Sequence, residues 1–245
     1  MSELSNNEIL NSKEETERAK LAFENYHRAL QYVNSFGEEK ISSEIVCKIH
    51  FLCMRGLLHE KATGIYRTVN VGINRSSKTP PPWERVRDLM DNFLEDLNGR
   101  LSKCSRNLNG LPCLIETIAF AHYTFERIHP FEDGNGRVGR LLCDLIAKRF
   151  GLRPIIIWPS DRQRYIDVLE AVNRSGNLAH LTLFLAEQFL KRYSEKEGGQ
   201  NNKNIKNIRR VLEEIIETQR EAIKNQSEPM SETNIWEGFT HPCFE

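Results

Sequence analysis

The chain has 245 residues, of which 39% are hydrophobic and 28% charged, as in an ordinary water-soluble globular protein. Lysine plus arginine and aspartate plus glutamate number 34 each, so the formal net charge is zero, which argues against a nucleic-acid-binding surface. Residues 1–13 are polar and lack a signal-peptide core, and no apolar run approaches the roughly 18 residues of a membrane span. These features predict a cytoplasmic protein with neither a membrane nor a nucleic acid as partner.

The cysteines support the same interpretation. They form no CxxC pair and fit no zinc-ligand spacing, and most of them lie inside apolar stretches. We therefore expect reduced thiols that act as small hydrophobic side chains in a reducing compartment. The six positions are Cys47, Cys53, Cys104, Cys113, Cys143 and Cys243.

Helical periodicity dominates the first hundred residues. Ser12 and Glu15 form a capping-box pattern that predicts a helix running past residue 32. Ser42 or Ser43 is placed to cap a second helix. A third follows the proline run 80–82, where apolar residues recur at three- and four-residue steps: Val86, Leu89, Met90, Phe93, Leu94 and Leu97.

Two segments look extended, namely residues 69–73, where apolar and polar side chains alternate, and the short run 155–158. A fourth helix begins near Leu114 and carries His122, and further helices are predicted over 136–150, 162–173 and 178–193. With about seven helices and at most one small β-hairpin, the fold class is all-α.

Composition also indicates how the chain is divided. Residues 1–14 form a lead-in, 15–194 a single domain, and 195–204 a glycine- and asparagine-rich linker, before a C-terminal helix and tail at 205–245. Apolar residues line one side of the charged helix 205–224. This helical appendage is suited to pairing with a regulatory partner or a second copy in a homodimer, or to resting as a solvated, weakly docked helix.

The chemistry is concentrated in residues 128–140, with the sequence IHPFEDGNGRVGR. Pro130 cannot continue a helix, so His129 lies at a helix end, where it is a base that titrates near neutrality. The Gly-Asn-Gly turn feeds the next helix, whose amides and dipole favour an anion. Asp133 is a hard oxygen ligand suited to Mg²⁺, and the two arginines that follow match phosphate oxygens.

Each of these features has an ordinary explanation when it is taken singly. A histidine before a proline is usually structural, a Gly-Asn-Gly step is usually a turn, and Asp133 fits a helix cap. A base, a metal ligand, an anion nest and two arginines within twelve residues form a set for phosphoryl chemistry. His122 carries the same ambiguity, between a buried core histidine and a supporting role near the site.

Residues 129–137, HPFEDGNGR, resemble the signature of the Fic family, H-P-F-x-[D/E]-G-N-G-R, without a mismatch. Arg140 also fits the second arginine often found three residues on. The resemblance extends over about residues 15–193, because the stretch 64–67 and the proline run 80–82 are similar to the family's flap and its exit. It implies a Fic-type helical core with a small β-hairpin flap.

The resemblance also implies an activity, the transfer of AMP from ATP to a serine, threonine or tyrosine hydroxyl of a target protein. His129 would be the general base, and Asp133 would hold Mg²⁺ between the α- and β-phosphates. The flap residues Val71 and Ile73 would dock the target by adding its main chain as a strand. Phe131 would anchor the loop in the core. The nucleotide would be held by Gly134, Asn135 (on the α-phosphate), Gly136, Arg137, Arg140 and, at the nucleoside, Tyr165 and Asn173.

Regulation is open at this stage. Many Fic enzymes carry an inhibitory helix of the form [S/T]-x-x-x-E-[G/N], whose glutamate pairs with the second signature arginine. Residues 233–238 fit this degenerate pattern and make Glu237 a candidate inhibitory residue, whereas residues 6–11 place Leu10 where the glutamate should be. Control in trans, or no control at all, is the alternative.

Other functions also fit parts of the sequence. One alternative is another Fic chemistry, namely phosphorylation, transfer of a different nucleotide, or removal of AMP. Gly136 argues against the phosphorylating branch, which usually alters the Gly-Asn-Gly step. A second alternative is a non-catalytic ATP-binding interaction protein, against which His129 and Asp133 argue because binding alone needs no general base.

Overall fold

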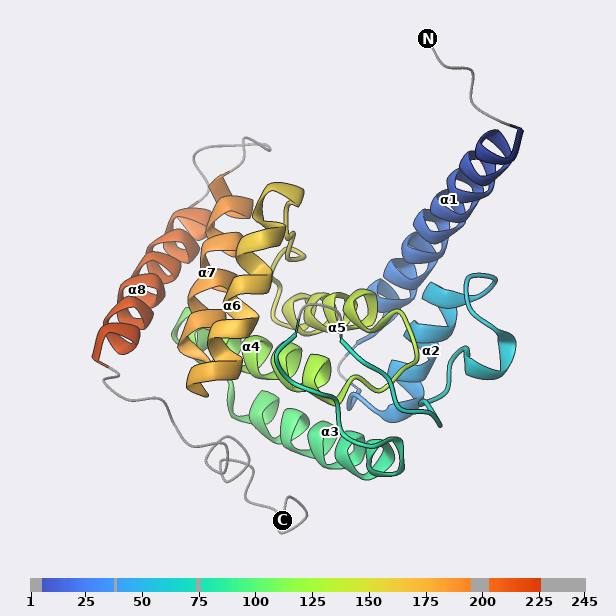
Figure 1. Cartoon of the computed structure of the whole chain (residues 1–245). Coiled ribbons are helices and arrows are strands. Elements are labelled where there is room, and N and C mark those ends of the chain that lie inside the picture. Colours follow the sequence, from blue (N-terminus) through green and yellow to red (C-terminus); the bar gives the residue numbers. More distant parts are fainter. Residues whose placement is uncertain (1–5, 38, 74–75, 195–202, 226–245) are drawn as a thin grey trace.

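The computed structural model describes residues 6–37, 39–73, 76–194 and 203–225, and its regular structure there is helical (Figure 1). The α-helices correspond to the predicted apolar periodicities, which confirms the all-α class. Their bounds are α1 Asn6–Ser35, α2 Ser43–Met54, α3 Val86–Lys103, α4 Leu111–Ile128, α5 Asn135–Arg149, α6 Arg162–Ser175, α7 Ala179–Ser194 and α8 Lys203–Asn225.

Helix α4 lies at the centre of the domain and packs against α3, α5, α7 and α8. It is buried over most of its length because it is apolar on nearly every side, as expected of a helix surrounded by others. The site is therefore built from the least exposed helix of the fold. No helix in the described part of the chain is both long and apolar enough to cross a bilayer.

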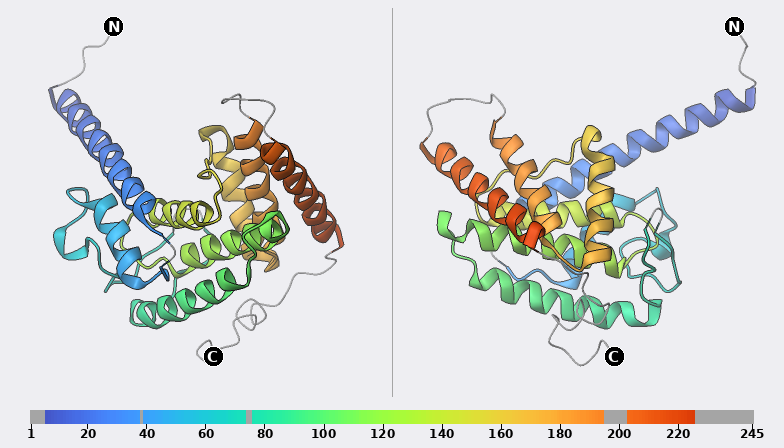
Figure 2. Two further views of the ribbon diagram at one scale, coloured as in Figure 1. Left: turned by 180° about the vertical axis from the view of Figure 1, so that it is seen from behind. Right: turned by 60° about the vertical axis from the view of Figure 1, so that its left-hand side comes forward.

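Helix α1 packs its C-terminal half against α2 and α5, while its N-terminal half projects from the body of the molecule (Figure 2). It begins at Asn6, six residues before the predicted start at Ser12, so position 12 lies inside the helix and not at its beginning. The reason is local, since residues 6–11 contain neither glycine nor proline to stop the helix from extending.

Neither extended prediction forms a strand in the described residues. In the segment 64–73, the carbonyl of Val69 accepts from Arg67 Nη1, and the side chain of Asn70 accepts from the N–H of Trp83 through Oδ1 at 2.9 Å. In the run 155–158, the N–H of Ile155 donates to Asp144 Oδ1 at 2.9 Å. The Val69 carbonyl and the Ile155 N–H thus bond to side chains and not to a neighbouring strand, so the residue pattern alone gave the wrong prediction.

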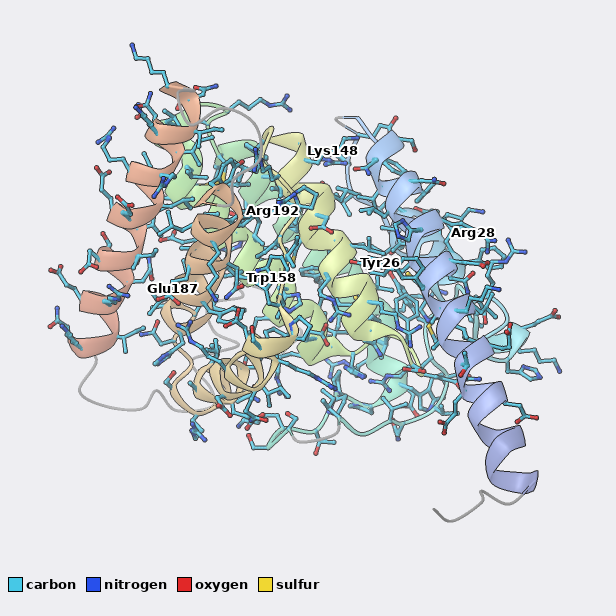
Figure 3. All side chains as sticks on the ribbon, turned by 90° about the horizontal axis from the view of Figure 1, so that it is seen from above. Tyr26, Arg28, Lys148, Trp158, Glu187 and Arg192 are labelled. Atoms are coloured by element: carbon cyan, nitrogen blue, oxygen red, sulfur yellow. A yellow bond between two sulfur atoms is a disulfide. The ribbon has the colours of Figure 1, made fainter. Side chains whose placement is uncertain are left out.

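Helix α8 packs along α7 and continues the same apolar core instead of lying weakly docked. Its apolar stripe inserts Val211, Leu212, Ile215 and Ile216. Glu187 on α7, labelled in Figure 3, accepts hydrogen bonds from Arg164 of α6 and Arg220 of α8. Helices α6, α7 and α8 therefore form one layer, which lies on the opposite side of α4 from α1.

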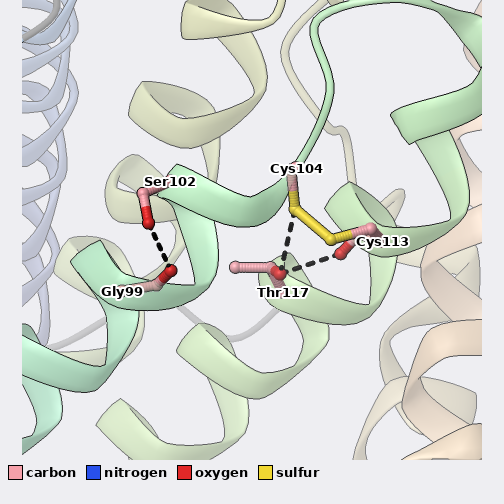
Figure 4. The surroundings of a disulfide bond; sticks show 5 residues. All are labelled: Gly99, Ser102, Cys104, Cys113 and Thr117. Carbon is pink, nitrogen blue, oxygen red and sulfur yellow. Dashed lines mark hydrogen bonds between the residues drawn. A yellow bond between two sulfur atoms is a disulfide. The ribbon is translucent and has the colours of Figure 1, made fainter.

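The cysteine prediction needs one correction. Cys104, at the end of α3, and Cys113, in the first turn of α4, form a disulfide across the connecting loop (Figure 4). Their Cα atoms are 5.7 Å apart, within bonding range for a disulfide, although the nine-residue spacing matches no motif. Cys47, Cys53 and Cys143 are free thiols as expected, and Cys243 lies outside the described residues.

Candidate active site

The end of α4 presents His129. The chain leaves the helix there in the left-handed conformation (φ 51°), and no other non-glycine residue in the described ranges has a positive φ. Such a conformation costs about 1–2 kcal/mol and persists only where the surroundings enforce it. Here the His129 N–H still donates to the Phe125 carbonyl at 2.9 Å, and Pro130 prevents the helix from continuing.

The imidazole of His129 is held by one of its two nitrogens. Nδ1 lies 3.3 Å from the Glu126 carbonyl oxygen, to which it can only donate, so the lone pair is on Nε2. Burial lowers the pKa of His129 below its usual 6.5, which favours the neutral ring at pH 7. Since 15% of the side chain is still exposed, the base is neutral, oriented and reachable.

A closed loop follows His129. The N–H of Phe131 donates to Asn135 Oδ1 at 2.9 Å, and Asn135 Nδ2 donates back to the Phe131 carbonyl at 2.8 Å. Phe131 itself is fully buried, as the resemblance implies for a core anchor. The amide side chain of Asn135 is thus used inside the protein, and only its backbone N–H is left to meet a phosphate.

The start of α5 supplies an anion site. Gly134 caps the helix with φ 83°, and its carbonyl accepts from the N–H groups of Arg137 and Val138. The N–H groups of Asn135 and Gly136 have no acceptor in the described part of the chain. Two unbonded amides at the positive end of a helix dipole are chemically suited to an anion such as a phosphate oxygen.

Two guanidinium groups flank these amides. Arg137 Nη1 donates to the thioether sulfur of Met54 at 3.0 Å, which is a weak acceptor. Arg140 Nη1 lies 3.4 Å from the place where a Gly136 Cβ would be. Neither arginine forms a salt bridge with a carboxylate among the described residues, so both charges remain available to an anion.

Asp133 is exposed beside the nest, and its Oδ1 accepts from the N–H of Gly134 at 2.6 Å. The other oxygen has no hydrogen-bond partner among the described residues. No group of three or more potential metal-binding side chains occurs among the described residues. A single carboxylate oxygen next to a phosphate site suits Mg²⁺, which is usually held by one or two carboxylates together with phosphates and water.

Sequence reasoning missed Glu126. Its carboxylate is nearly buried, with Oε1 lacking a hydrogen-bond partner and Oε2 4.0 Å from His129 Nδ1. Burial raises its pKa to about 7, against a smaller opposing effect of Arg140. The signal was present, because Glu126 lies three residues before His129 and four after His122, on one face of α4.

Arg67 holds several backbone carbonyls near the site, a role that the sequence did not predict although residues 64–67 were singled out. Its Nε donates to the His129 carbonyl at 2.8 Å, and its Nη2 to the carbonyls of Pro81 at 2.6 Å and Ile128 at 3.4 Å. The guanidinium therefore fixes both ends of the segment 67–81 to the C-terminal end of α4, where the helix dipole favours a cation. Val71 and Ile73 are half-buried on this segment, without the predicted hairpin.

The predicted nucleoside contacts lie on α6. Tyr165 Oη and His122 Nε2 are 2.6 Å apart, and burial lowers the pKa of His122 to about 4, so its ring is a neutral core histidine. Asn173 accepts from Tyr123 Oη at 3.0 Å and donates to Glu170 at 2.7 Å. Both side chains are therefore engaged within the protein, between α4 and α6. Glu237 lies outside the described residues.

Fold and site together define a helical protein in which an oriented histidine is followed by a helix start with two unbonded amides. Residues 40–147 match the family model described as the Fic/DOC family. It is 36% identical over 161 residues to a sea-anemone protein (Nematostella vectensis) named protein adenylyltransferase Fic, a match that covers 64% of this chain and 35% of that one. The Caenorhabditis elegans protein adenylyltransferase fic-1 is 31% identical over 165 residues, covering 65% and 30%.

Solved structures show the same fold. The fragment of Fic-1 from C. elegans, residues 134–508, has a TM-score of 0.55 at 24% identity, over 86% of this chain and 53% of that one. A Fic-domain signalling protein from Bacteroides thetaiotaomicron has a TM-score of 0.57 at 18% identity, over 82% and 73%. The chain spans about a third of the length of the curated relatives it matches.

Proposed function

We propose that this protein transfers AMP from ATP to a hydroxyl group of a target protein and releases pyrophosphate. One observation carries the proposal: the unbonded amides of Asn135 and Gly136, and two guanidinium groups without a carboxylate partner among the described residues, follow within a few residues of the oriented base His129. Relatives named protein adenylyltransferase support the same activity.

Each residue of the site has a separate role in the proposed reaction. His129 Nε2 takes the proton from the attacking hydroxyl, whose oxygen then forms a bond to the α-phosphorus. The bond from that phosphorus to the α,β-bridging oxygen breaks, and its electron pair leaves with pyrophosphate. The amides of Asn135 and Gly136 bind the non-bridging oxygens, and Arg137 and Arg140 neutralise the leaving phosphates.

Asp133 would hold Mg²⁺, which when bound neutralises charge shared by the α- and β-phosphates. The target would dock along the segment that carries Val71 and Ile73. Tyr165 and Asn173 would approach the nucleoside only after exchanging their present partners on α4 and α6. The cytoplasmic location stays a prediction of the sequence, since the disulfide removes part of its support.

The test is incubation with Mg²⁺, a cell lysate and ATP labelled either on the α- or on the γ-phosphate. We expect α-label and the mass of one AMP on a protein, and loss of both with His129→Ala but not with His27→Ala, which removes an exposed histidine of α1. Transfer of the γ-label would instead show phosphorylation. Bound ATP without transfer in any lysate would leave an ATP-binding interaction protein.

A further inference from the structure

A second histidine, His50 on α2, lies beneath the loop that carries Asp133. Its side chain is fully buried, and its ring is parallel to that of Phe131 with the ring centroids 3.8 Å apart. Because Phe131 anchors the signature loop, this stacking places the edges of the His50 ring between that loop and the first residues of the segment 64–67.

Both ring nitrogens of His50 form hydrogen bonds, and the partner of each nitrogen determines whether it donates or accepts. The N–H of Gly64 donates to Nδ1 at 2.9 Å, so Nδ1 carries no hydrogen. The ring hydrogen is therefore on Nε2, which donates to the Asp133 carbonyl at 3.0 Å. One imidazole thus connects two segments that are 69 positions apart in the sequence.

We propose that His50 is a positioning residue that fixes the Asp133 loop and the base of the target-docking segment relative to each other. The inference rests on the proposed function for the roles of those two segments. The Gly64 bond sets the first residues of the stretch that leads to Arg67. The Asp133 bond sets the peptide that carries the carboxylate and the left-handed Gly134 after it.

The two bonds can be removed one at a time. In His50→Asn, the side-chain oxygen lies where Nδ1 was and still accepts from Gly64, but no donor reaches Asp133. In His50→Gln, the longer amide reaches the position of Nε2 and still donates to Asp133, but leaves Gly64 without an acceptor. His50→Phe keeps the stacking on Phe131 and removes both bonds.

Two measurements separate the effects, and neither depends on protein modification. The first is the Mg²⁺ concentration that gives half-maximal ATP binding. We expect it to rise about five- to tenfold in His50→Asn, the size of one lost hydrogen bond, and to stay within about threefold in His50→Gln. The second is hydrogen exchange at the Gly64 amide, which should be at least about tenfold faster in His50→Gln and unchanged in His50→Asn.

A merely structural role would give a different result. If His50 only fills space, both variants will shift both measurements equally, and the proposal is overturned. Nitrogen NMR of the wild type adds a direct check, since a hydrogen on Nδ1 would also overturn it. His27→Asn on α1 is the matched control and should change neither measurement.

The outcome is separable from that of the proposed function. If the wild type binds Mg²⁺ and ATP but modifies no protein, the AMP-transfer proposal fails, while the opposite effects of the Asn and Gln variants still support the role of His50. If the wild type transfers AMP and the two variants behave alike, only the role of His50 fails.

Discussion

Replacing Gly134 by alanine tests the packing on which the anion site depends. Gly134 has a φ of 83°, where alanine costs about 1–2 kcal/mol. A Cβ there would also lie 2.6 Å from Met54 Sδ and 2.8 Å from Met54 Cγ. Met54 is fully buried, so it can move only by repacking, which adds about 1–3 kcal/mol.

Gly134→Ala should therefore lower the free energy of unfolding by about 2–5 kcal/mol in urea melts followed by circular dichroism. Gly99→Ala is the matched control. Gly99 lies in the interior of α3 with open space around the new methyl group, so that variant should gain about 0.5–1 kcal/mol.

A double-mutant cycle separates the two costs. In a Met54→Ala background the clash is gone, so Gly134→Ala should cost only the backbone part, about 1–2 kcal/mol. The reasoning is refuted if Gly134→Ala lies within 0.5 kcal/mol of the wild type, a bound taken from ordinary surface substitutions. An equal cost in both backgrounds would refute the clash alone.

Three further outcomes are expected. Burial raises the pKa of the Glu126 carboxyl from 4.5 to about 7 in the folded state, so the folded protein keeps a proton that the unfolded chain has lost, and wild-type stability falls as pH rises through that window. Glutamine cannot titrate. The free energy of unfolding of Glu126→Gln, relative to that of the wild type, should therefore rise by up to about 3 kcal/mol between pH 4 and pH 8 in urea melts. Since the pKa of His129 is lowered, the acidic limb of kcat/KM for AMP transfer should lie below pH 6.5, and a limb above that value contradicts the assignment of the base. Arg67→Lys keeps the charge but cannot reach all the carbonyls, so it should cost about 2–3 kcal/mol in the same melts. Arg162→Lys, at an exposed position of α6, should cost less than about 0.5 kcal/mol.

The helices were predictable from the sequence because each buries one apolar face, and burial imposes a period of about 3.6 residues on side chains such as Val86, Leu89 and Phe93. The segment 69–73 was not predictable in the same way. Its alternation favours a strand, but a strand also needs a partner, and here the carbonyl of Val69 accepts from the side chain of Arg67 instead. Periodicity records which side chains are buried and carries no information about hydrogen-bond partners.

The residues of the candidate site also fall into two groups, those that could be predicted from the sequence and those that could not. His129, Asp133 and the arginines after Gly136 were identified because they are close together in the sequence, where spacing alone predicts their proximity. His50 and Arg67 lie 83 and 62 residues from the groups that they hold, Asp133 and His129. Their burial is visible only in the structure, and a single histidine or arginine far from the signature carries no local pattern that marks it as a support of the site.

The geometry also changes what the nine signature residues contribute. Phe131 anchors the loop, the side chain of Asn135 ties its two ends together, and Gly134 permits the left-handed turn that exposes the amides. These residues contribute a backbone shape, and the phosphate would meet main-chain N–H groups more than side chains. It follows that Asn135→Asp, which loses the donor to the Phe131 carbonyl, should disturb ATP binding through the loop even though the lost group never touches the nucleotide.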